Sequence, residues 1–489
     1  MAKDTAIYGM SSIVGRFLNY LLVPLYTAKL TVESGGYGVI TNIYSYVALL
    51  LVILTYGMET AFFRFANKQD ENPGRVYSSI LISVGSTSLM FILLMLAFLP
   101  QVSSFIGYAD HPEYVGVMAV CVAIDAFQTI PFAYLRHRKK ALKFAALKLL
   151  FIVLNIALNL AYFVLLPALY KSHPDTIGLI YDPSIGVGYA FFINLFCTAI
   201  ITLFFRKELT GFKYVFDRRL MRRILSYSWP ILLLGITGIL NQTADKILFP
   251  FIYAGSDATA QLGIYGAASK VAMIMAVITQ AFRYAYEPFV FGKTGDRDNA
   301  ATQAQAMKFF IIFTLLAFLA VIAYLDILKY IIAPGYWSGL QVIPIVMAAE
   351  IMMGVYFNLS FWYKLTDRTI WGAVFSGIGC AVLVAVNIIF VPRFGYMACA
   401  WAGFAGYGTA MLLSYFVGRH YYPVPYPLKR ICAYVLLAAA IFAVYTFVRF
   451  DNIYIDLLLR TALLVAFLAV VIKVEHFRLP GRRHARPAQ

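Results

Sequence analysis

The chain has 489 residues, is 62% hydrophobic and only 13% charged, and carries a formal net charge of +17. Soluble domains contain about 25% charged residues, so the composition excludes a soluble protein. The apolar residues form continuous blocks of about 20 residues, which is the length of a membrane-spanning helix and not the alternating pattern of a barrel. We therefore predict an all-α integral membrane protein whose basic residues belong to cytoplasmic loops and not to a nucleic-acid site.

The hydropathy pattern predicts about 14 transmembrane helices. In chain order, the predicted spans lie near residues 6–28, 37–65, 76–100, 114–135, 142–166, 184–205, 228–253, 262–290, 306–326, 340–363, 370–391, 395–418, 431–449 and 454–473. The N-terminus runs into the first span without a small-residue cleavage site, so we expect a retained helix and not a signal peptide.

The distribution of basic residues predicts the orientation of these spans. With the N-terminus in the cytoplasm, 29 of the 40 lysine and arginine residues fall in cytoplasmic loops and ends, five fall in outer loops and six fall inside spans. This bias follows the positive-inside rule, so we expect both termini to be cytoplasmic.

A weak internal repeat divides the predicted spans into two halves. With an offset of 226 residues, Asn19 aligns with Asp245, and at the same offset Pro24 aligns with Pro250. An even number of spans in each half makes the repeat parallel, with a pseudo-two-fold axis along the membrane normal. The predicted domains are an N-terminal six-helix lobe at 1–205, a basic cytoplasmic linker at 206–227, a C-terminal six-helix lobe at 228–418, and helices 13 and 14 with a basic tail at 419–489.

Polar residues inside the membrane concentrate in spans one, two, seven and eight, which the repeat places face to face. Each cation at the bilayer centre costs roughly 2.5–3.5 kcal/mol, and a shared hydrated central cavity avoids that cost. The candidate substrate-binding residues of this cavity are Arg16, Asn19, Gln242, Lys246, Lys270 and Arg283. The candidate coupling or ion-pairing carboxylates are Glu59, Asp245, Glu287 and, in span ten, Glu350.

Two structural alternatives to a binding role stay open for these residues. Internal ion pairing that only holds helices together is the alternative for Arg283 with Glu287, and for the adjacent charged pair in span seven. Snorkelling to the outer surface is the alternative for Lys270, which lies near the outer end of its span. Arg16 has neither end of its span within easy reach, so the binding role is favoured most strongly there.

The remaining intramembrane polar residues suggest structural roles. Lys148 and Arg460 look isolated; we expect Lys148 to snorkel and Arg460 to have a structural role. Hydrogen bonds between helices are expected for a larger set, namely Asp125, Gln128, Asn155, Asn159, Asn194, Asn358 and Asn387. The sequence has no phosphate loop, no metal-binding spacing and no nucleophile elbow, so we expect neither ATP hydrolysis nor a metal site nor catalytic residues.

The first 70 residues carry a family resemblance. They resemble bacterial polysaccharide biosynthesis proteins, the lipid-linked oligosaccharide flippases of the multidrug/oligosaccharidyl-lipid/polysaccharide exporter superfamily. The segments that carry the resemblance are Gly15-Arg16-Phe17-Leu18-Asn19-Tyr20, Pro24-Leu25-Tyr26-Thr27, Tyr37-Gly38, Tyr44-Ser45-Tyr46 and Gly57-Met58-Glu59-Thr60-Ala61-Phe62-Phe63-Arg64. The resemblance implies two six-helix lobes around a cationic central cavity, in which Arg16 alone matches a functional position of the family.

The residues and the resemblance together predict a flippase. The substrate that the resemblance implies is an undecaprenyl-pyrophosphate-linked oligosaccharide, a repeat unit of O-antigen, capsule or exopolysaccharide, moved across the bacterial inner membrane by alternating access. No cofactor is expected, and the open choices for the driving force are Na⁺, H⁺ and the membrane potential. The expected partners are the lipid-linked glycan, membrane lipids, and a glycan polymerase or glycosyltransferase.

Two other functions compete with the flippase. The first alternative is an ion-coupled exporter of drugs or organic cations from the same superfamily, which would favour a cavity dominated by carboxylates. The second alternative is a polytopic membrane glycosyltransferase or polymerase, against which the short outer loops argue.

Overall fold

The computed structural model describes residues 20–69, 71–292, 299–366, 368–448 and 450–475, and the regular elements in this part of the chain are all helical. Among these described residues, ten helices are long and apolar enough to cross a membrane, and an eleventh candidate is a pair of helices bent by 41°. The predicted all-helical membrane fold is therefore confirmed. The count of about 14 spans stays a prediction, because most of the first span lies outside the described residues.

The chain forms two compact units, which we describe separately. The larger unit comprises Met1–Val277 and Ile331–Gly418, and the smaller unit comprises Ile278–Tyr330 and Arg419–Gln489. These boundaries differ from those of the predicted lobes, whose division stays a prediction.

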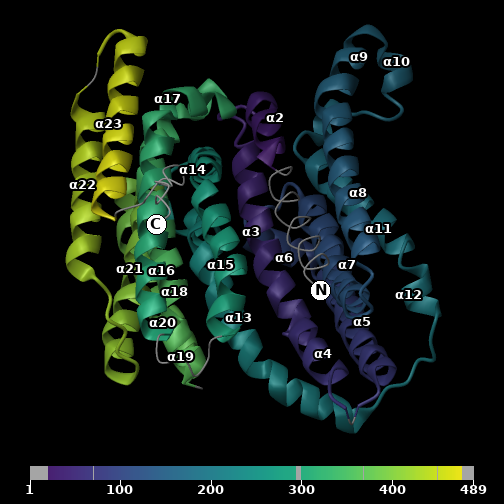
Figure 1. The fold of residues 1–489 in the computed structure, drawn as a ribbon. Helices are drawn as coiled ribbons and strands as arrows, with labels where there is room; N and C mark the ends of the chain where they lie inside the picture. The colour runs from purple at the N-terminus through teal and green to yellow at the C-terminus, as the bar shows by residue number, and fades with distance from the viewer. Residues whose placement is uncertain (1–19, 70, 293–298, 367, 449, 476–489) are drawn as a thin grey trace, which may run out of the picture. The chain divides into compact units, whose positions relative to one another are not determined.

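The first helices of the larger unit follow the predicted spans closely. They are α2 (Leu22–Lys29), α3 (Gly36–Thr55), α4 (Met58–Ala66), α5 (Pro73–Ala97), α6 (Leu99–Phe105), α7 (Pro112–His137), α8 (Ala141–Leu160), η1 (Ala161–Leu165), α9 (Leu166–Ser172), α10 (Pro174–Ile177), η2 (Pro183–Ile185), α11 (Gly188–Leu203) and α12 (Arg206–Thr210). Helix α7 lies at the centre of this group and packs against α3, α5, α8 and α11 (Figure 1).

The remaining helices divide between the two units. The larger unit contains α13 (Arg218–Ile252), α14 (Ala258–Ala272), η4 (Pro334–Val342), α18 (Ile343–Leu359), α19 (Phe361–Leu365) and α20 (Ile370–Phe394). The smaller unit contains α16 (Asn299–Ala323), α17 (Leu325–Leu328), α22 (Leu428–Phe447) and α23 (Ile453–Val474). The elements that cross a boundary are α15 (Ile274–Gly292), η3 (Lys329–Ile331) and α21 (Tyr396–Tyr421).

Helix α13 begins earlier than the sequence predicts, so part of the segment predicted as a linker at 206–227 is helical. The Asp217 carboxylate caps the helix by accepting hydrogen bonds from the backbone N–H groups of Arg219 and Leu220, each at 3.0 Å. These bonds lower the pKa of Asp217, chiefly through the N–H of Leu220. The first turns of α13 then bury Leu220 and Met221 in a core shared with α4 and α5.

The predicted span at 37–65 is broken where α3 meets α4. Tyr56 and Gly57 have φ angles of 31° and 72°, which lie in the left-handed region that favours glycine. A Cβ atom added to Gly57 would also lie 3.1 Å from the carbonyl oxygen of Ser228 on α13. Gly57 therefore allows both the left-handed backbone between α3 and α4 and the close approach of α13.

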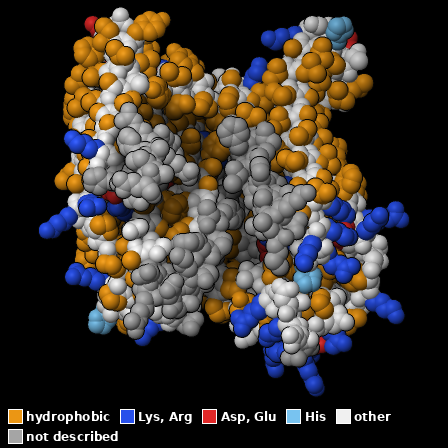
Figure 2. All heavy atoms as spheres, viewed as in Figure 1, with side chains coloured by type: hydrophobic (Ala, Val, Ile, Leu, Met, Phe, Trp, Pro, Cys, Tyr) orange, Lys and Arg blue, Asp and Glu red, His pale blue; other side chains and the backbone are white. Residues whose placement is uncertain are grey.

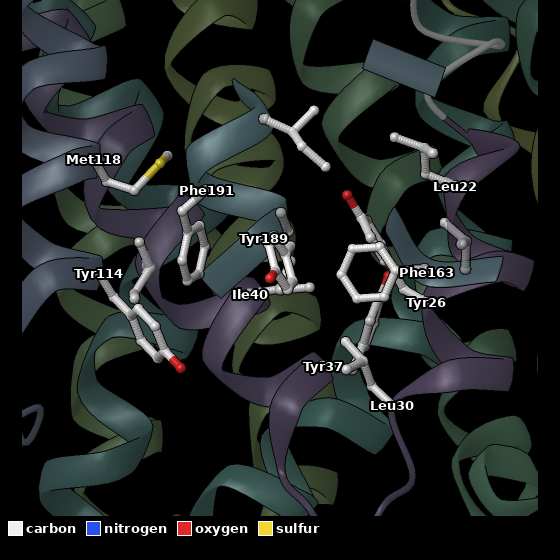
Figure 3. Close-up of a cluster of buried hydrophobic side chains, with 14 of the residues drawn as sticks. Leu22, Tyr26, Leu30, Tyr37, Ile40, Tyr114, Met118, Phe163, Tyr189 and Phe191 are labelled. Carbon is white, nitrogen blue, oxygen red and sulfur yellow. The ribbon is translucent and has the colours of Figure 1, made fainter. Parts of the chain in front are cut away.

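An aromatic core joins the first helices of the larger unit. Figure 3 shows Tyr26 of α2 beside Phe163 of η1, and their ring centroids lie 5.4 Å apart in an edge-to-face arrangement. The Tyr26 hydroxyl donates a hydrogen bond of 2.7 Å to Asn159 Oδ1. The polar end of this tyrosine is thus satisfied inside the core, as a buried hydroxyl requires.

Glycines allow α3 and α14 to cross in direct contact. A Cβ atom added to Gly38 would lie 1.8 Å from the carbonyl oxygen of Thr259 and 3.0 Å from the backbone nitrogen of Gly263. Tyr336 of η4 packs edge-to-face against Tyr37 of α3, with the ring centroids 5.9 Å apart, and its hydroxyl donates to the carbonyl oxygen of Leu30 at 2.6 Å. The structure thus brings predicted spans two and eight together.

The surface has the character of a membrane protein. Hydrophobic side chains cover most of the helices in view, while lysine and arginine side chains gather near the ends of α4, α5 and α12 (Figure 2). Lipid tails are as apolar as these side chains, so their exposure carries no cost in a bilayer. The cytoplasmic position of the basic end stays a prediction.

Candidate functional site

The candidate site of the larger unit is centred on α13. Lys246 Nζ lies 3.0 Å from each carboxylate oxygen of Asp245 and donates to the carbonyl oxygen of Gln242 at 2.9 Å. The Asp245 side chain is 7% exposed, whereas that of Lys246 is 20% exposed. These three residues therefore lie together, and the adjacent charges form an ion pair.

Pro250 determines how α13 is held near Lys246. A proline has no N–H, so Pro250 leaves the carbonyl oxygen of Lys246, four residues earlier, without its helical donor. Asn42 of α3 replaces that donor with its Nδ2 at 2.7 Å. Asn42 in turn accepts a hydrogen bond of 2.9 Å from the Tyr108 hydroxyl. The missing helical bond therefore becomes an attachment between α13 and α3.

Neighbouring helices orient the Asp245 carboxylate and the backbone beside it. The Tyr265 hydroxyl of α14 donates to Asp245 Oδ2 at 2.6 Å. Lys246 Nζ lies 5.2 Å from the centroid of the Tyr265 ring, which adds a cation–π contact. One turn earlier, the Tyr407 hydroxyl of α21 donates to the carbonyl oxygen of Asn241 at 3.0 Å. α14 therefore holds the Asp245 carboxylate, and α21 holds the backbone of α13 one turn before it.

Lys270 of α14 and Glu350 of α18 complete this cluster. Both are near enough to Lys246 for electrostatic interaction, which is repulsive for Lys270 and attractive for Glu350. Gln242 and Lys270 are exposed, and Glu350 is half-buried. Within the described residues, neither Lys270 nor Glu350 forms an ion pair. We call Gln242, Asp245, Lys246, Lys270 and Glu350 the α13 cluster.

The other predicted site residues are not part of the described α13 cluster. Arg16 and Asn19 lie outside the described residues. Glu59, at the start of α4, forms an ion pair with Arg136 at the end of α7. The remaining pair, Arg283 and Glu287, belongs to the part of α15 that lies in the smaller unit, so the predicted four-span cavity stays a prediction. 

Arg460 is not isolated, contrary to the expectation from the sequence. Its guanidinium lies 2.7 Å from Asp456 Oδ2 and 3.1 Å from Asp326 Oδ2, and it also donates to the carbonyl oxygen of Ala323 at 3.5 Å. Asp456 stands one helical turn before Arg460, a spacing that the sequence does display. Asp326 comes from α17, and nothing in the sequence connects it with α23.

Sequence reasoning missed a second polar cluster, around α7. The sequence predicts only separate hydrogen bonds between helices for Asp125 and Asn194. In the structure, the Thr198 hydroxyl donates to Asp125 Oδ1 at 3.1 Å and Asn194 Nδ2 donates to the Tyr44 hydroxyl at 2.6 Å. The available signal was the one-turn spacing of Cys121 with Asp125 and of Asn194 with Thr198, which places each pair on one helical face.

The N-terminal part of the chain matches a known protein family. The model of a family described as "Polysaccharide biosynthesis protein" matches residues 1–285, which is more than half of the chain. The chain belongs to this family. Lsg locus protein 1 of Haemophilus influenzae is 24% identical to this chain over 298 residues. The aligned region covers 59% of this chain and 65% of the Haemophilus protein. The match thus spans less than two thirds of that relative.

Solved structures with the same fold are membrane transporters. The lipid II flippase MurJ in an inward closed conformation aligns with a TM-score of 0.72 at 15% identity, over 96% of this chain and 99% of that chain. An inward-facing multidrug resistance MATE transporter of the MOP superfamily aligns with a TM-score of 0.65 at 16% identity, over 86% and 95% of the two chains. This member of the polysaccharide biosynthesis family therefore shares the fold of MurJ and of the MATE transporter.

Proposed function

We propose that this chain is a flippase that moves an undecaprenyl-pyrophosphate-linked oligosaccharide across the bacterial inner membrane by alternating access. The observation that carries the proposal is Lys270, an exposed lysine within a candidate span that has no described carboxylate partner and lies near a second lysine, Lys246. Membership of a polysaccharide biosynthesis family and a transporter fold support the same direction.

The chemistry of the two lysines suits a pyrophosphate headgroup. An ammonium group is a compact charge with three donors, and its hydrogen bonds to phosphate oxygens are roughly twice as strong as neutral ones. Lys270 offers this charge without a competing carboxylate, whereas Lys246 must leave Asp245 to do the same. In this proposal Lys270 makes the first contact, and Arg16 is the further cation expected from the sequence.

The carboxylates of the α13 cluster provide a route to release. Asp245 stays within reach of Lys246 when phosphate binds, because Tyr265 holds its Oδ2 at 2.6 Å. Binding therefore exchanges one anion for another on Lys246, and release reverses the exchange. Such an exchange keeps the bound state from becoming so stable that the substrate is not released. Binding that is equally tight at every step of transport would not speed the cycle.

The experiment is complementation of a strain that lacks this gene. Lys270→Ala and Lys246→Ala should each lower surface polysaccharide by about tenfold to a hundredfold, because each removes a charge-assisted contact of about 1.5–3 kcal/mol. Lys270→Arg should retain part of the export. Lys473→Ala is the matched control, since Lys473 is an exposed lysine at the end of α23. Membrane levels of each variant are measured on the same cells.

Different results would favour the two alternatives. Normal export by Lys270→Ala and Lys246→Ala would remove the lysines from the site. Loss of resistance to organic cations in Asp245→Asn and Glu350→Gln, with polysaccharide export unchanged, would identify a drug exporter. Transfer of sugar by the purified protein, without movement of lipid, would identify a glycosyltransferase or polymerase.

A further inference from the structure

A second candidate site lies inside the larger unit, between α3, α7, α8 and α11. It is centred on Asp125, which lies in the middle of α7, a helix whose most apolar stretch is 67% buried. Asp125 is half-buried, whereas its neighbours Cys121 and Thr198 are buried. A carboxylate at this depth is costly and marks a functional position by default.

The hydrogen-bond partners of Asp125 are neutral. The Thr198 hydroxyl donates to Oδ1 at 3.1 Å, and Cys121 Sγ lies 3.9 Å from Oδ2. Cys121 Sγ also lies 3.7 Å from Asn194 Oδ1 and 3.7 Å from Thr198 Oγ1. Three oxygen atoms from two helices thus surround one thiol, and one of them belongs to the carboxylate.

Gln128 and Tyr44 fix the frame around this carboxylate. Gln128 Nε2 donates to the carbonyl oxygen of Thr198 and to Thr202 Oγ1, each at 2.8 Å. Asn194 Nδ2 donates to the Tyr44 hydroxyl at 2.6 Å, which turns Asn194 Oδ1 toward Cys121. The polar groups are therefore positioned by their own bonds, independently of the protonation of Asp125.

The titratable groups that face this site are few. Lys148 of α8 attracts the Asp125 carboxylate electrostatically, and its Nζ lies 4.1 Å from the centroid of the Phe132 ring, yet it forms no ion pair with Asp125. The other titratable neighbours are Cys121 on α7 itself and Tyr44 on α3. In the described structure, α4, α5, α6 and α12 contribute no charged group that interacts with Asp125.

We propose that Asp125 is a proton-binding site in the N-terminal part of the transporter, separate from the α13 cluster. An O–H bond forms on the Asp125 carboxylate, with a hydronium ion of the water phase as the donor, and the proton later returns to water on the other side. The described residues contain no group of three or more acidic, histidine or cysteine side chains that would hold a metal, and the central thiol is a poor ligand for a hard cation.

Lys148 links proton binding to conformation. With Asp125 ionised, the two charges balance; with Asp125 protonated, the positive charge of Lys148 loses its compensation inside the span. An uncompensated lysine favours a conformation in which its ammonium group reaches water. Proton uptake thus shifts the larger unit from one conformation to another. Such a shift requires that Asp125 bind the proton more tightly in one conformation than in the other.

The test uses the purified full-length protein in proteoliposomes and needs no substrate. Infrared difference spectra between acidic and neutral pH should show a buried protonated carboxyl band that is lost in Asp125→Asn and shifted in Asp125→Glu. Asp175→Asn, at an exposed position of α10, is the matched control and should keep the band. Size-exclusion profiles show that each variant folds, and Asp125→Glu covers the case in which the asparagine variant does not.

A transport measurement separates this proposal from the proposed function. With a fluorescent polyprenyl-pyrophosphate-linked sugar, a gradient of one pH unit should change the wild-type flipping rate by up to about tenfold and leave Asp125→Asn unaffected. An unchanged band in Asp125→Asn would overturn the proton site whether or not lipid is moved. A carboxylate band in the wild type that responds to Na⁺ at fixed pH would overturn it in favour of a cation site. The absence of any lipid movement, with the band behaving as expected, would reject only the flippase.

Discussion

Arg460 and Lys270 are both cations inside predicted membrane spans, and the structure treats them in opposite ways. Arg460 is buried, with 7% of its side chain exposed, and has carboxylates of Asp456 and Asp326 within 3.1 Å. Lys270 is exposed, has no described carboxylate partner, and is repelled by the nearby Lys246. One cation is neutralised by carboxylates of the protein itself, and the other has no counter-charge among the described residues.

The difference shows that a cation in a span is not by itself evidence of a site. A mid-membrane charge costs roughly 2.5–3.5 kcal/mol, and a protein can avoid that cost either by internal pairing or by water and a ligand. Only the second choice leaves a charge that can bind something else. The useful question is therefore which carboxylate lies beside each cation in three dimensions.

The largest expected effect is on stability, at Arg460. Arg460→Leu should lower the free energy of unfolding by about 3–5 kcal/mol, because it leaves the buried Asp456 without a counter-charge. Lys270→Leu should change it by about 0.5 kcal/mol or less, since the side chain is exposed. Thermal unfolding of the purified variants in detergent measures both.

A double variant separates charge from packing at Arg460. Arg460→Leu combined with Asp456→Leu removes both buried charges and should recover much of the lost stability, since replacing a whole buried ion pair by apolar residues is often neutral. Equal losses of stability in Arg460→Leu and Lys270→Leu would erase the distinction between the two cations.

An intermediate effect is expected at Asp245, where one substitution turns an internally paired cation into an unpaired one. Asp245→Asn should leave Lys246 without its carboxylate partner, so that Lys246, like Lys270, becomes an unpaired lysine. Stability should fall by about 1–3 kcal/mol, and farnesyl pyrophosphate should bind more tightly, because Lys246 no longer has a competing anion. Titration of the purified protein with farnesyl pyrophosphate measures the change in affinity.

The matched control for Asp245 lies in the smaller unit. Asp456→Asn removes a carboxylate from Arg460 in the same way, but Arg460 keeps Asp326 at 3.1 Å. This variant should lose stability and gain no affinity for farnesyl pyrophosphate. Tighter binding in Asp456→Asn, or weaker binding in Asp245→Asn, would contradict the role given to the α13 cluster.

The fold could be read from the sequence because long apolar segments leave few choices. A spanning segment must satisfy its backbone internally, so each apolar block becomes a helix. The helices differ from the predicted spans where a capping residue or a glycine, and not hydropathy, sets the helix boundary. Asp217 begins α13 ahead of its apolar part, and Gly57 separates α3 from α4 inside one apolar block.

The site could be read from the sequence only where its residues are neighbours in the chain. Asp245 and Lys246 are adjacent, so the sequence already offers an ion pair between them as an alternative to ligand binding. Glu59 pairs with Arg136 across two helices, and the neighbours of Asp125 come from helices far apart in the chain. Residues of this kind resemble ordinary hydrogen-bonding groups until the packing of the helices brings them together.

The smallest expected effect concerns a second internally paired charge, Glu475 at the end of α23. Its carboxylate forms an ion pair with Lys308 and accepts a hydrogen bond of 2.9 Å from the Tyr434 hydroxyl. Burial alone would raise the pKa of Glu475, but these partners outweigh burial and hold the pKa below its usual range. The stability from this group is therefore complete above the unfolded-state pKa of about 4.3 and is lost as the pH falls through the lower folded-state pKa.

Glu475→Gln tests this acid dependence. Each unit by which the folded-state pKa is lowered corresponds to about 1.4 kcal/mol, so the variant should lose part of the acid-induced fall in melting temperature that the wild type shows. Lys270→Gln should leave that fall unchanged, because no described carboxylate is paired with Lys270. Identical acid dependence in the wild type and Glu475→Gln would mean that Lys308 does not stabilise the ionised carboxylate, and that internal pairing at this end of the smaller unit is weaker than at Arg460.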